Sequence, residues 1–260
     1  MEVKRLSLVI MKVEEGFAVL ELEANVPNMG FIYPVLLWDE RELVLIDAGL
    51  PGQTQSIIEL IKREGVQPEK LTKIIITHQD MDHIGSLAQI VKTVDNAGRE
   101  QGKVQVFSHE LEKPYIQAEK MPIKFTAEML EKKKRELAEL TPEKRKEYNE
   151  IFSGNKPKVT DILSHGEELS CCGGLKIIHT TGHTPGHISI YLEKYKSLIA
   201  GDALNVSDGR LAGPNPVHTY DMVQARKSLE TLLNYDIERV VCYHGGLISG
   251  NIGNQIREFI

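Results

Sequence analysis

The chain has 260 residues, of which 41% are hydrophobic and 26% are charged, so an ordinary globular core is expected and disorder is not. The formal net charge of −6 at pH 7 argues against a surface that binds nucleic acid. An apolar run near the N-terminus, residues 6–11, is too short for a membrane span or for the core of a signal peptide. We therefore expect a soluble, cytoplasmic protein with no nucleic-acid or membrane partner.

The hydrophobic pattern of the first hundred residues predicts strands that alternate with helices. Two hairpins are expected first, formed by residues 6–10 with 17–22 and by residues 31–38 with 43–46. A helix follows, because apolar side chains form a stripe over residues 53–64 and Gly65 ends it. The next predicted elements are a strand at 74–76, a helix at 85–93 and a strand at 104–108.

Residues 110–160 interrupt this pattern with dense charge and apolar side chains at helical spacing. Within them, Thr141-Pro142-Glu143 is typical of a helix start, with an N-cap, a proline in the first helical position and an acid in the first turn. We predict a helical insert within a single domain that covers residues 1–260. The insert is either a solvated amphipathic hairpin or a lid over a functional site.

The strand-rich pattern resumes after residue 157. The predicted elements are strands at 175–179, 188–192, 197–200 and 239–243 and a helix at 220–233. Periodicity alone predicts only a mixed α/β fold. The three cysteines do not form the paired spacing of a structural zinc site, so we expect them to be small buried thiols.

The residues that follow the strand at 74–76 hold the densest set of candidate metal ligands. His78, Asp80, Asp82 and His83 lie within six positions, between that strand and the next predicted helix. We expect them on a tight loop at the carboxyl end of the strand, where functional residues often gather. Imidazole and carboxylate together suit zinc, iron or manganese.

Four further motifs accompany residues 77–85, one before them in the sequence and three after them. They are Leu43 to Gly49, which ends in Asp47-Ala48-Gly49, Thr181-Gly182-His183-Thr184-Pro185-Gly186-His187, Ala200-Gly201-Asp202 and Tyr243-His244-Gly245-Gly246. Together with residues 77–85 they resemble the metallo-β-lactamase superfamily over about residues 25 to 250. The resemblance implies an αββα sandwich, in which two sheets face each other and helices lie outside. One departure stands out, because Asp80 takes the place of the second histidine of the His-x-His-x-Asp-His signature.

The resemblance also implies a binuclear metal centre. His78, Asp80 and His183 would hold the first metal, whereas Asp82, His83 and His244 would hold the second. Asp202 would bridge the two. By the same resemblance, Asp47 would support the site without binding metal, and His187 would form hydrogen bonds or pack.

The function implied is that of a metal-dependent hydrolase in which a metal-bridging hydroxide cleaves an ester, thioester or lactone. The motifs are more similar to the glyoxalase II and acyl-homoserine lactonase branches than to true β-lactamases. Asp82 is the candidate catalytic residue, because it would orient the hydroxide as well as bind metal. An alternative is a flavodiiron-like oxidoreductase with a separate electron donor, and another is a phosphodiesterase.

Two divalent metal ions are the expected cofactors, with zinc favoured. Iron and manganese are alternatives, because Asp80 adds a hard oxygen ligand. The expected partner is a small-molecule substrate. Its acyl, lactone or phosphoester group and the oligomeric state are left open, with a homodimer as one option.

Overall fold

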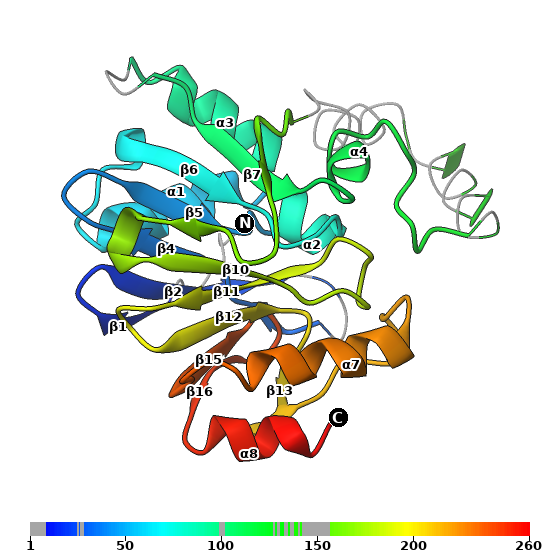
Figure 1. Cartoon of the computed structure of the whole chain (residues 1–260). Coiled ribbons are helices and arrows are strands. Elements are labelled where there is room, and N and C mark those ends of the chain that lie inside the picture. The colour runs from blue at the N-terminus through cyan, green and yellow to red at the C-terminus, as the bar shows by residue number, and fades with distance from the viewer. Residues whose placement is uncertain are drawn as a thin grey trace.

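Two β-sheets lie face to face between two layers of helices in the computed structural model of the chain (Figure 1). The structure describes residues 9–24, 26, 29–98, 102–126, 128, 131, 132, 135, 138, 139, 141 and 157–260. Of the predicted helical insert at residues 110–160, residues 110–126 are described and contain a short helix at Lys113–Ile116. Most of residues 127–156, including Pro142 and Glu143 of the predicted helix start, lie outside the described residues.

The first sheet, as far as the described residues show it, has eight strands in the order β1-β2-β4-β5-β6-β7-β8, with β3 paired to β2. Strands β5 to β8 run parallel to one another, and the remaining pairs are antiparallel. The strands are β1 (Val9–Glu14), β2 (Phe17–Glu23), β3 (Phe31–Ile32), β4 (Val35–Trp38), β5 (Leu43–Ile46), β6 (Leu71–Ile75), β7 (Gln105–His109) and β8 (Asp161–Leu163).

The second sheet has six strands in the described part of the chain, in the order β16-β15-β12-β11-β10-β9. Only β12 and β15 are parallel within it. Its strands are β9 (Glu168–Leu169), β10 (Leu175–His179), β11 (Ile188–Leu192), β12 (Ser197–Gly201), β15 (Arg239–Cys242) and β16 (Gly246–Ser249). A separate hairpin pairs β13 (Asn205–Ser207) with β14 (Arg210–Ala212).

Helices flank the two sheets on their outer faces and at one edge (Figure 1). They are α1 (Thr54–Arg63), α2 (Met81–Ile84), α3 (Leu87–Asp95), α4 (Lys113–Ile116), α7 (Met222–Leu232) and α8 (Ile252–Arg257), with short 3₁₀ turns η1 (Pro68–Lys70) and η2 (Cys171–Gly173). Helices α1 and α3 pack their apolar stripes on the first sheet, and α7 and α8 pack on the second. No helix within the described ranges is long and apolar enough to cross a membrane.

The space between the sheets is filled by apolar side chains from both inner faces. Phe17, Val19 and Val44 of the first sheet belong to one buried cluster with Ile177 and Ile190 of the second. Burial of this surface is the main term that holds the two sheets together. The predicted αββα sandwich is therefore confirmed, and the rigid strands carry the site at their ends.

The observed strands differ from the predicted ones where the backbone interrupts a continuous apolar run. The predicted strand at 31–38 is two strands, because Tyr33 and Pro34 separate β3 from β4 and a proline has no N–H to donate to the ladder. The predicted strand at 6–10 is β1, which begins at Val9 within the described residues and extends to Glu14. Strand β6 begins at Leu71, three residues earlier than predicted, because it pairs with β5 along that length.

Candidate metal centre

The candidate ligands of the first sheet lie just beyond the carboxyl end of β6. His78 and Asp80 are in the turn that follows the strand, as predicted. The prediction of a loop for all four residues was wrong for Asp82 and His83, which lie on the one-turn helix α2. The main-chain oxygen of Asp80 accepts hydrogen bonds from the N–H groups of His83 and Ile84, which closes this turn.

The second sheet contributes three more candidate ligands at the same edge of the sandwich. His183 lies in the turn between β10 and β11, Asp202 directly follows β12, and His244 follows β15. Since β12 and β15 are parallel neighbours, Asp202 and His244 leave the sheet on the same side. All seven candidate ligands therefore meet where the ends of the two sheets come together.

Their ligand atoms form two adjacent groups. One contains His78, Asp80, His183 and Asp202, and the other contains Asp82, His83 and His244, with the ligand atoms of each group within 4.8 Å of one another. Within the first group, the Nε2 atom of His183 lies 3.1 Å from Oδ2 of Asp80. Within the second, the Nε2 atom of His244 lies 3.2 Å from Oδ2 of Asp82.

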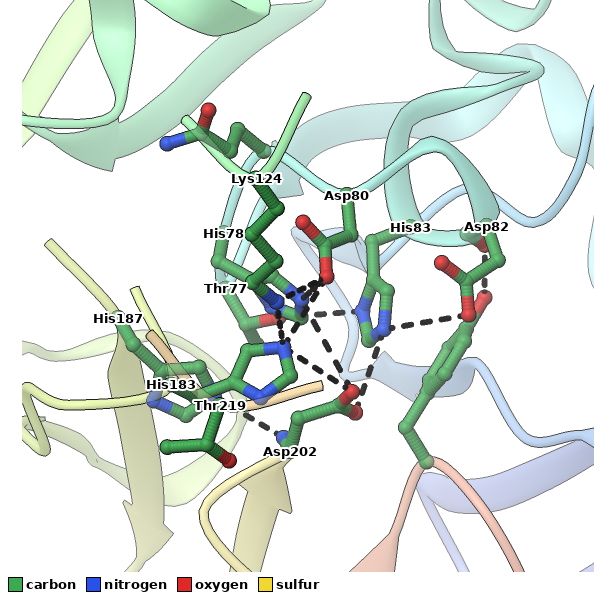
Figure 2. A network of polar contacts seen from close by, with 12 residues as sticks. Thr77, His78, Asp80, Asp82, His83, Lys124, His183, His187, Asp202 and Thr219 are labelled. Carbon is green, nitrogen blue, oxygen red and sulfur yellow. Dashed lines mark hydrogen bonds and ion pairs between the residues drawn. The ribbon is translucent and has the colours of Figure 1, made fainter. Parts of the chain in front are cut away.

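Asp202, a member of the first group, also lies close to the second, and Figure 2 shows its carboxylate next to His183 and His83. Its Oδ1 atom is 3.3 Å from Nε2 of His83, and its Oδ2 atom is 3.3 Å from Nε2 of His183. Oδ2 is also 3.5 Å from Nε2 of His244. A single carboxylate thus faces side chains of both groups, which is the placement expected of a bridging ligand.

The buried side chains behind the histidines fix the orientation of two rings. Asp47 Oδ2 lies 2.8 Å from Nδ1 of His83 and accepts a hydrogen bond from Thr77 Oγ1 at 2.8 Å. Thr77 Oγ1 also lies 3.1 Å from Nδ1 of His78. With Nδ1 engaged on this side, each ring turns Nε2 toward the site. Asp47 holds a positive φ of 62°, a backbone conformation that non-glycine residues seldom adopt and that clusters at functional sites.

His187 and Tyr243 support other members of the site. His187 Nε2 accepts the main-chain N–H of Asp202 at 3.0 Å, and its Nδ1 lies 2.9 Å from Thr180 Oγ1, so both ring nitrogens are engaged. This agrees with the expected hydrogen-bonding role. The Tyr243 hydroxyl donates to the main-chain oxygen of Asp82 at 2.6 Å, and the Tyr243 ring packs on His83 with centroids 3.7 Å apart.

Burial and neighbouring charges shift the pKa values of several ionisable groups in the site. Burial works against the charged carboxylate of Asp80, yet the charge of His78 and a hydrogen bond from His183 hold its pKa well below the usual range. Burial lowers the pKa of His183 to about 4. Burial also opposes protonation of His244, but Asp202 and Asp82 raise its pKa to about 10. The carboxylates therefore favour positive charge on His244, whereas burial favours the neutral form of His183.

Several buried atoms of the site have no hydrogen-bond partner among the described residues. These include Nε2 of His78, Nε2 of His83 and Oδ1 of Asp202. Buried polar atoms are rarely left unpaired in proteins, and these three face the region where the two groups meet. Imidazole nitrogens and carboxylate oxygens are suitable ligands for zinc, iron or manganese, so the residues present fit a divalent metal centre.

Sequence reasoning missed two residues of the segment after β7. Lys124 places its ammonium group 2.5 Å from Oδ2 of Asp80 and 2.7 Å from Nε2 of His183 (Figure 2). Glu112 is completely buried. Its carboxylate accepts hydrogen bonds from the main-chain N–H groups of Gln79, in the loop that carries His78, and of Gly186, in the loop that carries His183. No sequence motif marks either residue. His109, at the end of β7, stacks on His179 and belongs to neither group.

A family profile described as "Metallo-beta-lactamase superfamily" matches residues 28–244. The chain is 28% identical to the "Probable metallo-hydrolase YflN" of Bacillus subtilis (strain 168), over 88% of this chain and 84% of that relative. It is 25% identical to the "Metallo-beta-lactamase fold-containing protein ST1585" of Sulfurisphaera tokodaii, over 87% of this chain and 76% of the relative.

Solved structures show the same fold. The metallo-beta-lactamase family protein TTHA1429 of Thermus thermophilus superimposes with a TM-score of 0.68 at 22% identity, covering 94% of this chain and 78% of that one. A metallo-beta-lactamase from Pontibacter korlensis superimposes with a TM-score of 0.66 at 16% identity, covering 97% and 98% of the two chains.

Proposed function

Because this chain belongs to the metallo-beta-lactamase superfamily, we propose that it is a hydrolase that holds two divalent metal ions and cleaves an ester, thioester or lactone in a small-molecule substrate. The observation that carries the proposal is the meeting of two adjacent groups of metal-ligating side chains at one edge of the sandwich. The name of the Bacillus subtilis relative, a probable metallo-hydrolase, supports the same reaction class.

Each candidate ligand has a role in this proposal. His78, Asp80 and His183 would hold the first ion, and Asp82, His83 and His244 would hold the second. Asp202, whose carboxylate lies next to His83 and His183, would contact both. Two divalent ions held by these residues would supply an activated water and polarise the carbonyl of the substrate. Asp82 is the candidate catalytic residue, because its carboxylate would also accept a hydrogen bond from the attacking water and orient it. Hydrogen bonds with Thr77 and Asp47 fix the orientation of the His78 and His83 rings.

The ligand set favours zinc as the resident metal and leaves iron or manganese as alternatives. Four imidazoles suit zinc, whereas three carboxylates, with Asp80 as the unusual member, suit harder ions as well. The identity of the metal at the first position therefore depends on how strongly the Asp80 carboxylate binds it.

Exposed apolar side chains on the segments that contact the first group support an acyl substrate. Phe125 follows Lys124, and Tyr220 donates its main-chain N–H to the oxygen of His183. Met121 and Val217 lie on the same two segments and are also exposed. A site flanked by such apolar side chains would suit a partly apolar small molecule.

The test is reconstitution of metal-free protein with zinc, iron or manganese, followed by assays on a panel of esters, thioesters, lactones and phosphodiesters. The acyl compounds should vary in chain length. We expect metal-dependent hydrolysis of at least one acyl class, near-complete loss in His183→Ala, and unchanged activity in His165→Ala, which alters an exposed histidine. Turnover of phosphodiesters alone, or hydrolysis that does not depend on added metal, would refute the proposal.

A further inference from the structure

Glu112 is a carboxylate buried at the junction of three segments around the first group of ligands. Its exposed fraction is 0%, and it lies between β7 and α4, outside both groups of candidate ligands. A carboxylate in such a place is costly to bury unless several donors satisfy it. The donors that satisfy Glu112 indicate what it does.

Two of these donors come from the His78 loop. The main-chain N–H of Gln79 donates to Oε2 of Glu112 at 2.9 Å, and the Gln79 side-chain amide donates to the same atom at 3.0 Å. Gln79 stands between His78 and Asp80 in the sequence, and only 2% of it is exposed. The position of Glu112 therefore constrains the backbone from which both ligands project.

The third donor comes from the His183 loop of the other sheet. The main-chain N–H of Gly186 donates to Oε1 of Glu112 at 2.8 Å. A side chain at position 186 would place its Cβ 2.8 Å from both Cγ and Oε1 of Glu112, so the loop comes this close only because the residue is glycine. One carboxylate thus holds the two loops that supply His78, Asp80 and His183 at a fixed separation.

Gln79 extends this connection to the segment that carries Lys124. The side-chain oxygen of Gln79 accepts the main-chain N–H of Ile123 at 2.9 Å, and Ile123 precedes Lys124. Glu112 therefore orients an amide that anchors residues 122–125 next to the first group. The second group lacks such a link in the described structure and is supported instead by Asp47, Thr77 and Tyr243.

We infer that Glu112 is a positioning residue that sets the spacing of the two ligand loops and so determines metal affinity at the first position selectively. The inference rests on the proposed metal centre. Charge-assisted hydrogen bonds to a fixed carboxylate are strong and directional, which suits this role. Glu112→Gln keeps the volume but presents an N–H group to a donor on one of the two loops, so one link is lost.

The experiment measures stepwise binding of Zn²⁺ or Co²⁺ to metal-free protein by competition with a chromophoric chelator. His183→Ala, which removes a ligand of the first position only, identifies which binding step belongs to that position. We expect Glu112→Gln to weaken that step by about 10- to 100-fold, the effect typical of groups that support metal ligands, and to leave the other step unchanged. Glu110→Gln, at the exposed neighbouring glutamate, is the matched control and should change neither step.

A second variant keeps the charge of Glu112. Gly186→Ala should separate the loops sterically and weaken the same step, and it provides the test if Glu112→Gln does not fold. The d–d spectrum of bound Co²⁺ should change for the first position only. Equal weakening of both steps, or no weakening in either variant, would overturn the role of Glu112. Failure of the wild-type protein to bind any metal would instead count against the proposed metal centre itself.

Discussion

At the scale of single residues, Asp80 is the side chain that, by the resemblance of the sequence motifs, takes the place of a histidine. Its Oδ2 atom lies 3.1 Å from Nε2 of His183 and 3.4 Å from Nε2 of His78, within the group of side chains that could hold the first metal. A carboxylate oxygen is harder and closer to the backbone than an imidazole nitrogen. We therefore expect Asp80→His to shift the preference of the first position toward zinc and away from manganese and iron.

Metal content after growth in medium that contains all three metals, measured by elemental analysis, checks this expectation. Asp161→His, at a carboxylate of strand β8 outside both ligand groups, controls for the added histidine. An unchanged ratio of metals in Asp80→His would show that Asp80 does not bind the first ion.

For Lys124, we predict that removal of the ammonium group raises metal affinity at the first position. Its ammonium group contacts Oδ2 of Asp80 and Nε2 of His183, the two atoms that the first ion would need. The ammonium must therefore leave when a metal binds, and its departure lowers the observed affinity. Lys124→Met keeps most of the side-chain length and should raise affinity at the first position about tenfold, which corresponds to roughly 1.4 kcal/mol.

Chelator competition with Lys124→Met and with the control Lys120→Met measures this effect. Lys120 is an exposed lysine of the same segment, so its loss changes the net charge equally. A weaker or unchanged first step in Lys124→Met would contradict competition between the ammonium group and the metal.

The seven candidate ligands could be proposed from the sequence because each lies in a short motif that resembles a motif of the metallo-β-lactamase superfamily. Lys124 and Glu112 could not be found in this way. They lie on the segment after β7, and their approach to the ligand loops depends on hydrogen bonds with Gln79 and Gly186, which are distant in sequence. Tertiary packing, and not local pattern, brings them to the site.

At the scale of elements, helix α7 supports the loop that carries His183. The main-chain oxygen of Gly182 accepts the N–H of Asp221, the N-cap of the helix. A Cβ at position 182 would lie 2.2 Å from the main-chain nitrogen of Ala225 in α7, and Gly182 has a φ of +135°. Gly182→Ala should therefore displace the helix from the loop, destabilise the fold by about 1–3 kcal/mol and weaken metal binding at His183.

Urea unfolding and chelator competition on the same samples test this expectation. Asp221→Ala removes the side-chain acceptor for the N–H of Gln224 and should cost about 1 kcal/mol of stability without a comparable effect on metal affinity. If the two variants lowered metal affinity equally, close packing of Gly182 against α7 would not explain the position of His183.

Among the elements, the long apolar strands were the easiest to predict. Strands β10 and β11 have the predicted bounds, because β11 is a continuous buried run and most residues of β10 are buried. The hairpin of β13 and β14 and strand β16 were not predicted. Each has three or four residues and little alternation, so its strand conformation depends on its partners and not on its own sequence.

At the scale of the whole molecule, the site joins the two halves of the sandwich. His78, Asp80, Asp82 and His83 follow strand β6 of the first sheet, whereas His183, Asp202 and His244 follow strands of the second. The αββα architecture could be predicted because the order of the motifs resembles a known family, whereas periodicity alone indicated only a mixed fold. The contact between sheets that aligns the two sets of ligands comes from the shared apolar core.

We propose that two divalent ions, held where the ends of the two sheets come together, are needed for hydrolysis. The most direct measurement titrates the preferred metal into metal-free protein and follows bound metal, thermal stability and hydrolysis in the same samples. We predict that two equivalents bind per chain and that hydrolysis reaches its plateau only with the second. The melting temperature should rise, because ions that bind only the native state stabilise it by about 2.7 kcal/mol at a free concentration of 100 Kd. Full hydrolysis in the metal-free protein, or a plateau after a single bound equivalent, would contradict the claim.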